Sequence, residues 1–383
     1  MKVLFISHHL KGNDGWSRYA RNLINAVQKE GEEVLCLVNE ITDDITIPQK
    51  KCLSEPLKYV ANPIISLRTA LIVNEYIQEF SPDIVHFVVE PYATIIPFLK
   101  RRKAKIALSV HSTFAFMPIL VSGFRHFVLN YTTRWMYAGT DLIIAVSEYT
   151  KQYLIRHMAG IKASLLVENK IVVSSGGIDL FKFILQREHN ASPVSEILFV
   201  GAIKPRKGLK EAIEALALVK EDYIFRIVGL CNENDPYFLL LKQKIKEYNL
   251  EKKIIFIGQV SDEELRKLYG KADLFLMLST NNGVDFEGYG LVYLEANAYG
   301  IPCIGPNDSG VSDAIINGKT GYLVNQYDAP AVASVIDDVL TCHPIHQEDC
   351  IAWARENSKE KKVEKIIVLY RNLLKGIKQN LSR

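Results

Sequence analysis

Runs of apolar, often β-branched residues alternate with helical patterns along the chain, and this alternation limits the possible folds more than any other feature. The runs lie at Lys2–Ser7, Asp83–Val89, Lys105–Val110 and Asp141–Ser147, and at five further places between Glu196 and Gly305. Apolar and polar residues do not alternate in these runs, which is typical of strands that are buried on both faces of a parallel sheet. Strand–helix alternation of this kind predicts an α/β fold with doubly wound sheets.

The chain has 383 residues, which is long enough for two domains of this kind. The pattern restarts after Ser174–Phe183, and the polar, proline-containing stretch Gln186–Ser195 indicates a linker. We therefore predict two Rossmann-like lobes, residues 1–185 and 186–357, that face an inter-domain cleft. An amphipathic helix in residues 358–383 is expected to pack back towards the N-terminal domain. Ligands of such sheets bind beyond the carboxyl ends of the strands, so the cleft is the expected site.

Charge, cysteine content and hydropathy argue against several function classes. The formal net charge of +3 gives no argument for a nucleic-acid partner. The six cysteines form no CxxC pair, which favours reduced thiols over a disulfide framework or a zinc site. No run approaches the roughly 18 apolar residues of a membrane span, and the N-terminus lacks the features of a signal peptide. We expect a cytoplasmic protein without a metal or cofactor held by protein ligands.

The stretch FEGYGLVYLEANAYGIP contains two carboxylates, Glu287 and Glu295, that are eight positions apart. Gly288 and Gly290 disfavour a helix through the first carboxylate, so we expect the helix to begin near Leu291. Glu287 would then lie on the loop at the strand ends. Glu295 would lie about one turn inside the helix.

A helix that begins there presents unpaired amides beside the positive end of its dipole, which makes a phosphate site. The amides are those of Gly290, Leu291 and Val292. The Glu295 carboxylate can accept hydrogen bonds from both hydroxyls of a vicinal diol such as ribose. Diphosphate on the amides and ribose on the carboxylate together predict a nucleoside diphosphate ligand.

This stretch resembles the E-x7-E motif of the retaining glycosyltransferases of family 4, which have the GT-B fold. The segments on either side, ADLFLMLS and IPCIGPNDSGVSDAIINGKTGYLV, also resemble that family. The resemblance implies that Glu295 holds the nucleotide ribose. It also implies that Glu287, as a catalytic residue, contacts the donor sugar together with the loop amides of Gly288, Tyr289 and Gly290.

The similarity extends over nearly the whole chain. FVGAIKPRKGLKEAIEAL resembles the family's strand–loop–helix that meets the donor phosphates. Lys207 and Gly208 match the usual lysine–glycine pair, whereas Ala202 stands at the position of the usual arginine. Lys204 and Arg206 are the two candidates for the missing charge, and the sequence leaves open which of them supplies it.

Further segments complete the resemblance. KIIFIGQVSDEELRKLYGKADLFL resembles the segment whose backbone near Gln259 and Val260 holds the base. GNDGWSRYARNL resembles the glycine loop after the first strand, where Gly15, followed by Trp16, lets the backbone approach the diphosphate and the acceptor. His111 ends a buried strand where the family has a histidine bonded to the transferred sugar, so it is a second catalytic candidate. The alternatives are a plain strand–helix turn and a structural histidine.

Basic and aromatic residues gather at Leu99–Lys105 and at Phe124–Tyr137. One interpretation is a solvated charge run followed by a packed helix. The other is a surface that docks on an anionic membrane bearing a lipid-linked acceptor, which would make the protein peripheral on the inner face of that membrane.

The resemblance implies that a sugar moves from a UDP- or GDP-linked donor to a hydroxyl of a saccharide or lipid-linked acceptor, with retention of configuration. Such a reaction belongs to bacterial-type polysaccharide, glycolipid or glycoconjugate synthesis. Lys207, Arg206 and the helix end near Leu291 would stabilise the departing diphosphate. The alternatives are a nucleotide-sugar epimerase or a phosphorylase of the same fold, or a non-catalytic nucleotide-sugar-binding protein. The base, the sugar, the acceptor, the linkage and the oligomeric state stay open.

Overall fold

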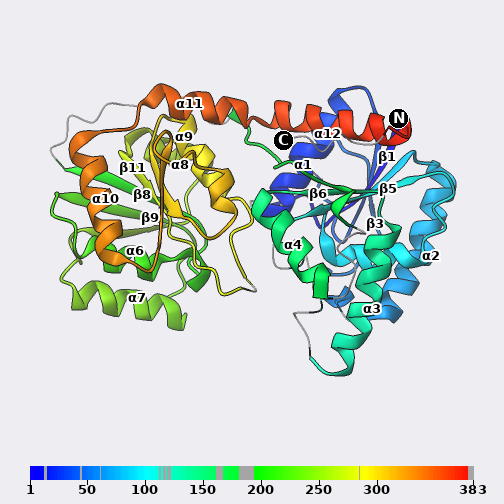
Figure 1. Cartoon of the computed structure of the whole chain (residues 1–383), viewed down its shortest axis with the longest axis horizontal. Helices are drawn as coiled ribbons and strands as arrows, with labels where there is room; N and C mark the ends of the chain where they lie inside the picture. Colours follow the sequence, from blue (N-terminus) through cyan, green and yellow to red (C-terminus); the bar gives the residue numbers. More distant parts are fainter. Residues whose placement is uncertain are drawn as a thin grey trace. The chain divides into compact units, whose positions relative to one another are not determined.

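The computed structural model describes residues 1–12, 15–43, 45–60, 62–111, 114, 118, 122–160, 167–180, 194–283 and 285–377. These form two compact units, Met1–Gly177 with Lys359–Arg383, and Ile178–Ser358 (Figure 1). Each unit is built on its own parallel sheet, so the prediction of two Rossmann-like α/β domains is confirmed. The linker predicted at Gln186–Ser195 lies almost entirely outside the described residues.

The first unit contains a seven-stranded sheet in the order β3-β2-β1-β4-β5-β6-β7. Its strands are β1 (Lys2–Ile6), β2 (Glu33–Val38), β3 (Gln49–Lys51), β4 (Ile84–Phe87), β5 (Lys105–Val110), β6 (Leu142–Ala145) and β7 (Ile171–Val173). The chain runs outwards from β1 to β3 and then returns to β4 on the other side of β1. The chain adds β2 and β3 on one side of β1 and β4 on the other. The boundary between β1 and β4 is therefore a topological switch point.

Helices cover this sheet and supply the rest of the first unit's core. They are α1 (Gly15–Lys29), α2 (Pro63–Phe80), α3 (Phe124–Gly139), α4 (Glu148–Gly160) and α12 (Lys359–Leu374), with the 3₁₀ segments η1 (Pro56–Tyr59) and η2 (Glu90–Phe98). The C-terminal helix α12 packs against α1 and buries an apolar stripe that ends at Tyr370.

The second unit contains a six-stranded sheet in the order β10-β9-β8-β11-β12-β13. Its strands are β8 (Ser195–Val200), β9 (Tyr223–Val228), β10 (Ile254–Gly258), β11 (Leu274–Leu276), β12 (Cys303–Pro306) and β13 (Gly321–Val324). Its helices are α6 (Leu209–Leu216), α7 (Pro236–Glu247), α8 (Asp262–Lys271), α9 (Leu291–Ala298), α10 (Ala329–Cys342) and α11 (Gln347–Glu356), with the 3₁₀ turns η5 (Pro205–Lys207) and η6 (Gly310–Asp313). Here the switch point lies between β8 and β11.

The apolar runs predicted as strands all contain strands, but β2, β3, β7 and β13 were not predicted. The strand β3 shows why a search for apolar runs misses some strands. Its three residues, Gln49–Lys51, are polar, and they are ordered by pairing with β2 at the edge of the sheet. An edge strand of this kind depends on its neighbour more than on its own hydrophobicity.

Candidate functional site

The switch point of the second sheet brings two loops together. Strands β8 and β11 pair in parallel, so the loops that follow them leave the same edge of the sheet. One loop contains η5, and the other leads through Glu287 to α9. The amide of Thr280 donates a hydrogen bond to the carbonyl of Arg206 over 2.9 Å, which ties the two loops to each other. Doubly wound sheets bind ligands at such an edge, which makes it the candidate site.

A glycine makes this close approach possible. Gly208 has a φ of +69°, in the left-handed region that favours glycine. A Cβ at this position would lie 1.7 Å from the carbonyl oxygen of Leu278, two residues after the end of β11. Since no side chain fits there, Gly208 holds the preceding residues, Arg206 and Lys207, directly beside the second loop.

Charged side chains from both loops meet at this edge. Nη1 of Arg206 donates to Oε2 of Glu287 over 2.9 Å, and Nζ of Lys207 donates to the same oxygen. Nε of Arg206 lies 3.2 Å from Oδ1 of Asp285. Burial acts to raise the pKa of Glu287, but the two cations outweigh it and the pKa lies below its usual value. Glu287 is therefore ionised at neutral pH and forms a charged cluster with Arg206 and Lys207.

The helix α9 begins at Leu291, as predicted, and its start adjoins the charged cluster. Gly290 caps the helix with a φ of +83°, and a Cβ there would lie 2.7 Å from the ring of Tyr293 and 3.6 Å from Cγ of Glu287. Leu291 and Val292 are half-buried in the first turn. The amino end of a buried helix therefore lies beside Glu287, and its dipole adds positive potential there.

Two other predicted residues are buried. Glu295 is 1% exposed and accepts a hydrogen bond over 3.1 Å from Oη of Tyr269, which belongs to α8. The ring of Tyr289 is also buried, and its hydroxyl donates to Oδ1 of Asn357 over 3.1 Å. A ligand beside this loop would thus meet the backbone of Tyr289 rather than its hydroxyl.

The remaining predicted residues of the second unit lie at the same edge of the sheet. Gly288 is half-buried between Glu287 and the helix cap. Val260 is half-buried in the loop that follows β10, immediately before the capping box of Ser261 and Glu264 at the start of α8.

In the first unit, the structure brings Trp16 and His111 near the start of α1. Gly15 is the exposed first residue of this helix, and a Cβ there would have no neighbour within 4 Å. The Trp16 ring lies 5.5 Å from that of Phe114. The ring of His111 packs edge-on against Tyr19 of α1, with 4.7 Å between ring centroids.

The orientation of the His111 ring is set by the backbone. Its Nε2 lies 2.9 Å from the carbonyl oxygen of Val88, which can only accept, so this nitrogen carries the proton. In the neutral ring, Nδ1 is then the acceptor. The backbone amide of His111 donates to the buried carboxylate of Glu90.

Sequence reasoning missed three polar partners of these residues. Asp285 lies two positions before Glu287 in the same acidic loop, so its charge was a usable signal. Glu90 directly follows a predicted strand, which also marks it as a residue at the carboxyl edge of the sheet. Tyr269 gave no signal, because only the packing of α8 on α9 places it beside Glu295. Among the described residues, no group of three or more His, Cys, Asp or Glu side chains could hold a metal ion.

Comparison with protein families agrees with this architecture. Residues 13–180 match the family described as Glycosyltransferase Family 4, and residues 182–357 match the one described as Glycosyl transferases group 1. The two matches coincide closely with the two units and together cover about nine tenths of the chain. The chain therefore carries a glycosyltransferase domain in each unit, and its fold is the GT-B fold of glycosyltransferases.

Individual proteins show the same likeness. The putative colanic acid biosynthesis glycosyltransferase WcaL of Salmonella typhimurium is 31% identical over 191 residues, which are 49% of this chain and 46% of WcaL. The chain spans about half the length of the curated relatives it matches.

Solved structures show the fold over the whole chain. A glycosyltransferase from Rickettsia africae has a TM-score of 0.77 at 23% identity, with 98% of both chains covered. HepE from Anabaena, in complex with UDP and glucose, has a TM-score of 0.74 at 16% identity, with 98% of this chain and 100% of HepE covered.

Proposed function

We propose that the protein is a retaining glycosyltransferase of the E-x7-E type, which moves a sugar from a nucleoside diphosphate to an acceptor hydroxyl. The observation that carries this proposal is the charged cluster of Arg206, Lys207 and Glu287 at the switch point of the second sheet. A diphosphate leaving group needs fixed positive charge where its own negative charge develops. Two cations and the amino end of α9 offer that charge at one edge of the sheet.

The diphosphate would bind to the two cations of the cluster. In the structure described here, a single carboxylate accepts hydrogen bonds from both Arg206 and Lys207. A diphosphate carries more negative charge than Glu287 and offers more acceptor oxygens, so it can take over both donors. Arg206 would then supply the charge missing at Ala202. This assignment is supported by its contact with Glu287, whereas Lys204 is exposed and precedes η5.

Glu287 would act on the sugar once the diphosphate holds the cations. Its carboxylate is ionised, so it can accept hydrogen bonds from sugar hydroxyls and stabilise positive charge that develops on the sugar ring. On this proposal the acceptor attacks from the face that the diphosphate leaves, and the leaving phosphate takes the acceptor proton. No protein nucleophile and no metal ion is assigned a step.

The resemblance and the comparisons suggest the remaining assignments. Glu295 would hold the ribose, and the backbone at Val260 the base, of a UDP- or GDP-linked donor. His111, Gly15 and Trp16 would serve the sugar and the acceptor from the first unit. The naming of WcaL for colanic acid biosynthesis supports a role in polysaccharide or glycoconjugate synthesis.

A thermal-shift panel with UDP, GDP, ADP and their sugars tests the proposal. A ligand at 100 times its dissociation constant should stabilise the protein by about 2.7 kcal/mol. Arg206→Ala and Lys207→Ala should abolish the shift, whereas Lys204→Ala, a matched loss of charge in the same loop, should retain it. Equal losses in all three variants, or no shift with any nucleotide, would refute the diphosphate assignment.

Product analysis separates the proposal from its alternatives. A glycosyltransferase consumes the nucleotide sugar only when an acceptor hydroxyl is present, apart from slow hydrolysis. Release of an epimerised nucleotide sugar without acceptor would show an epimerase instead. Binding without any turnover, over a panel of saccharide and lipid-linked acceptors, would favour the non-catalytic protein.

A further inference from the structure

Four aromatic side chains of α3 lie on the surface of the first unit and not in its core. They are Phe124, Phe127, Tyr131 and Trp135, with exposed fractions of 80%, 68%, 53% and 49%. Their spacing of three or four residues places them on one stripe of the helix. The opposite side of α3 is the one that the core uses, through Leu129, Met136 and Tyr137. The helix therefore has a second apolar face, which the fold leaves in solvent.

The neighbouring helix α2 shows the same arrangement over its first half. Ile64, Leu67 and Leu71 are 63%, 48% and 58% exposed, and they too are three or four positions apart. The apolar stripe stops where the acidic residue Glu75 begins the second half of the exposed face. The core side of α2 is formed by residues such as Val73.

The helices α2 and α3 are neighbours in the fold. Both α2 and α3 pack against η2, and residues from both helices line one small pocket with Thr94 and Phe98. Figure 1 shows the two helices as neighbours at the edge of the first unit. We call the α2 stripe and the α3 stripe together the α2–α3 surface. Scattered exposed apolar residues are ordinary, but seven on two adjacent helices mark an interaction surface.

The segment that contains η2 and α3 is rich in positive charge. Residues 91–140 contain no aspartate or glutamate and seven lysines or arginines. The whole chain has 43 acidic residues in 383, so about five or six would be expected in fifty. Among the cations, Arg102, Lys103 and Arg134 are exposed. The α3 stripe is therefore flanked by positive charge, whereas the exposed face of α2 becomes acidic only from Glu75 onwards.

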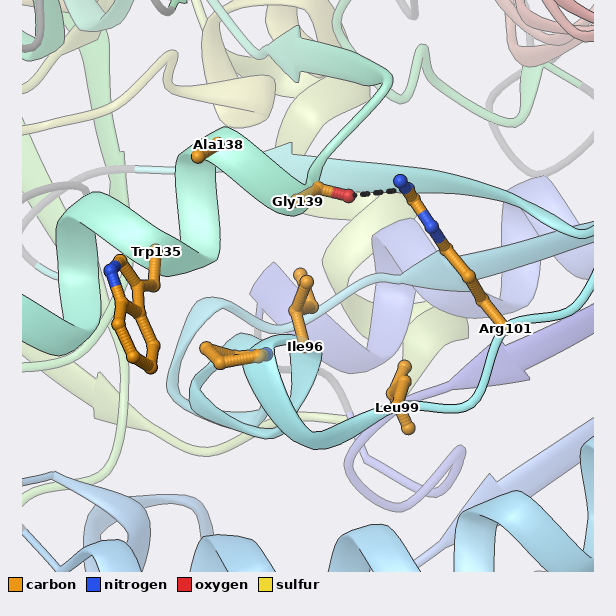
Figure 2. A pocket seen from close by; sticks show the side chains of 7 residues that line it. Ile96, Leu99, Arg101, Trp135, Ala138 and Gly139 are labelled. Atoms are coloured by element: carbon orange, nitrogen blue, oxygen red, sulfur yellow. Dashed lines mark hydrogen bonds between the residues drawn. The ribbon is translucent and has the colours of Figure 1, made fainter.

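A shallow pocket joins the basic loop to the aromatic stripe. Figure 2 shows it between Leu99 and Arg101 on the loop after η2 and Trp135 near the end of α3. Its volume is about 290 Å³. Nη1 of Arg101 donates to the carbonyl of Gly139 over 2.8 Å and lies 3.1 Å from Oδ2 of Asp141. These bonds fasten the loop that carries Arg102 and Lys103 to the C-terminal end of α3, beside Trp135.

We propose that the α2–α3 surface docks on an anionic lipid bilayer. Aromatic and apolar side chains would enter the interface between headgroups and acyl chains, where tryptophan and tyrosine are preferred. The cations around them would pair with acidic headgroups. No helix among the described residues is long and apolar enough to span a membrane.

The charge distribution favours a bilayer over a second copy of the chain. In a two-fold symmetric contact the same surface would face itself, and the like charges on its borders would repel each other. An anionic bilayer instead offers the complementary charge over its whole area. The inference goes beyond the proposed function, because it concerns the first unit alone and requires neither the nucleotide nor the charged cluster.

Vesicle co-sedimentation of the full chain tests this surface. The protein is mixed with vesicles of phosphatidylcholine, or of phosphatidylcholine with phosphatidylglycerol, at low and at high salt. We expect binding to the anionic vesicles, weaker binding at high salt, and little binding to the zwitterionic ones. A blue shift of tryptophan emission on binding, lost in Trp135→Phe, would place α3 at the interface.

Matched pairs of substitutions distinguish binding through this surface from non-specific adsorption to lipid. Phe124→Ser with Phe127→Ser should lower the partition onto anionic vesicles by about tenfold or more, and so should Arg102→Gln with Lys103→Gln. Two pairs on the second unit are the controls, and they should leave binding unchanged. The control pairs are Leu230→Ser with Leu239→Ser, both exposed apolar residues, and Lys246→Gln with Lys252→Gln, both exposed cations.

The outcomes that overturn the proposal are distinct. Absence of vesicle binding, equal binding to both lipid mixtures, or equal losses in the test and control pairs would each refute it. Concentration-dependent dimers in sedimentation, abolished by Phe124→Ser with Phe127→Ser and unaffected by lipid, would assign the surface to a second copy. Circular dichroism and the nucleotide thermal shift of every variant show whether the fold and the second unit are intact. If no nucleotide stabilises the protein, vesicle binding is still expected, so the failure of the proposed function can be distinguished from the failure of this inference.

Discussion

Replacement of Gly208 by alanine tests most directly how the candidate site is held together. The new methyl carbon would lie 1.7 Å from the carbonyl oxygen of Leu278 and 2.2 Å from its carbon. The left-handed φ of +69° costs a residue with a Cβ about 1–2 kcal/mol. The overlap is with backbone, so no rotamer change relieves it, and a forced backbone shift adds about 1–3 kcal/mol. We expect the free energy of unfolding of the second unit to fall by about 2–5 kcal/mol.

A second glycine supplies the matched control for this change. Gly318 has a φ of +76°, but a Cβ there would have no neighbour within 4 Å. Gly318→Ala should therefore lose only the conformational term of about 1–2 kcal/mol. Urea unfolding is followed by the emission of Trp353 after Trp16 and Trp135 are replaced by phenylalanine, because Trp353 is then the only tryptophan and belongs to the second unit. Equal midpoints for the two alanine variants would show that the loops do not approach closely.

Three further predictions follow from single contacts. Glu287→Gln keeps the shape of the side chain but removes the negative charge that pairs with Lys207. UDP affinity should therefore be unchanged or higher, while the rate of sugar transfer should fall at least about tenfold. Weaker UDP binding in calorimetry would contradict this. Tyr269→Phe removes the hydroxyl that donates to Glu295 and should lower the free energy of unfolding in urea by about 1 kcal/mol. Glu295→Ala should weaken UDP binding, and an unchanged UDP affinity would count against the ribose contact. Burial lowers the pKa of His86 from 6.5 to about 3, so the unfolded chain binds more protons between these values and stability falls as pH drops below 6.5. The loss should reach about 2 kcal/mol at pH 5, and His86→Gln should flatten this part of the pH–stability curve.

The local parts of the candidate site were predictable from sequence because they depend on neighbouring residues. Apolar runs without polar alternation located the main buried strands, and Gly288 and Gly290 placed the start of α9 at Leu291. The lysine–glycine pair at Lys207 and Gly208 pointed to the loop after β8. In each case the position of the element depends on the backbone preference of one residue or on the pattern of apolar residues over a short segment.

Other features were decided only by the tertiary structure. The contact of Arg206 with Glu287 is one of them, because Glu287 lies some 80 positions further along the chain. The same holds for the burial of Glu295 against Tyr269, because two helices must first pack on one sheet.

The exposed face of α3 shows this division most clearly. Its sequence holds enough aromatic residues for a packed helix, and periodicity says only that they share stripes. Which stripe meets the core is set by how α3 packs on η2, and that packing leaves Phe124, Phe127, Tyr131 and Trp135 in solvent. Sequence determined the residues on each face, and the fold determined which face stays in solvent, because burial is a property of the assembled layers.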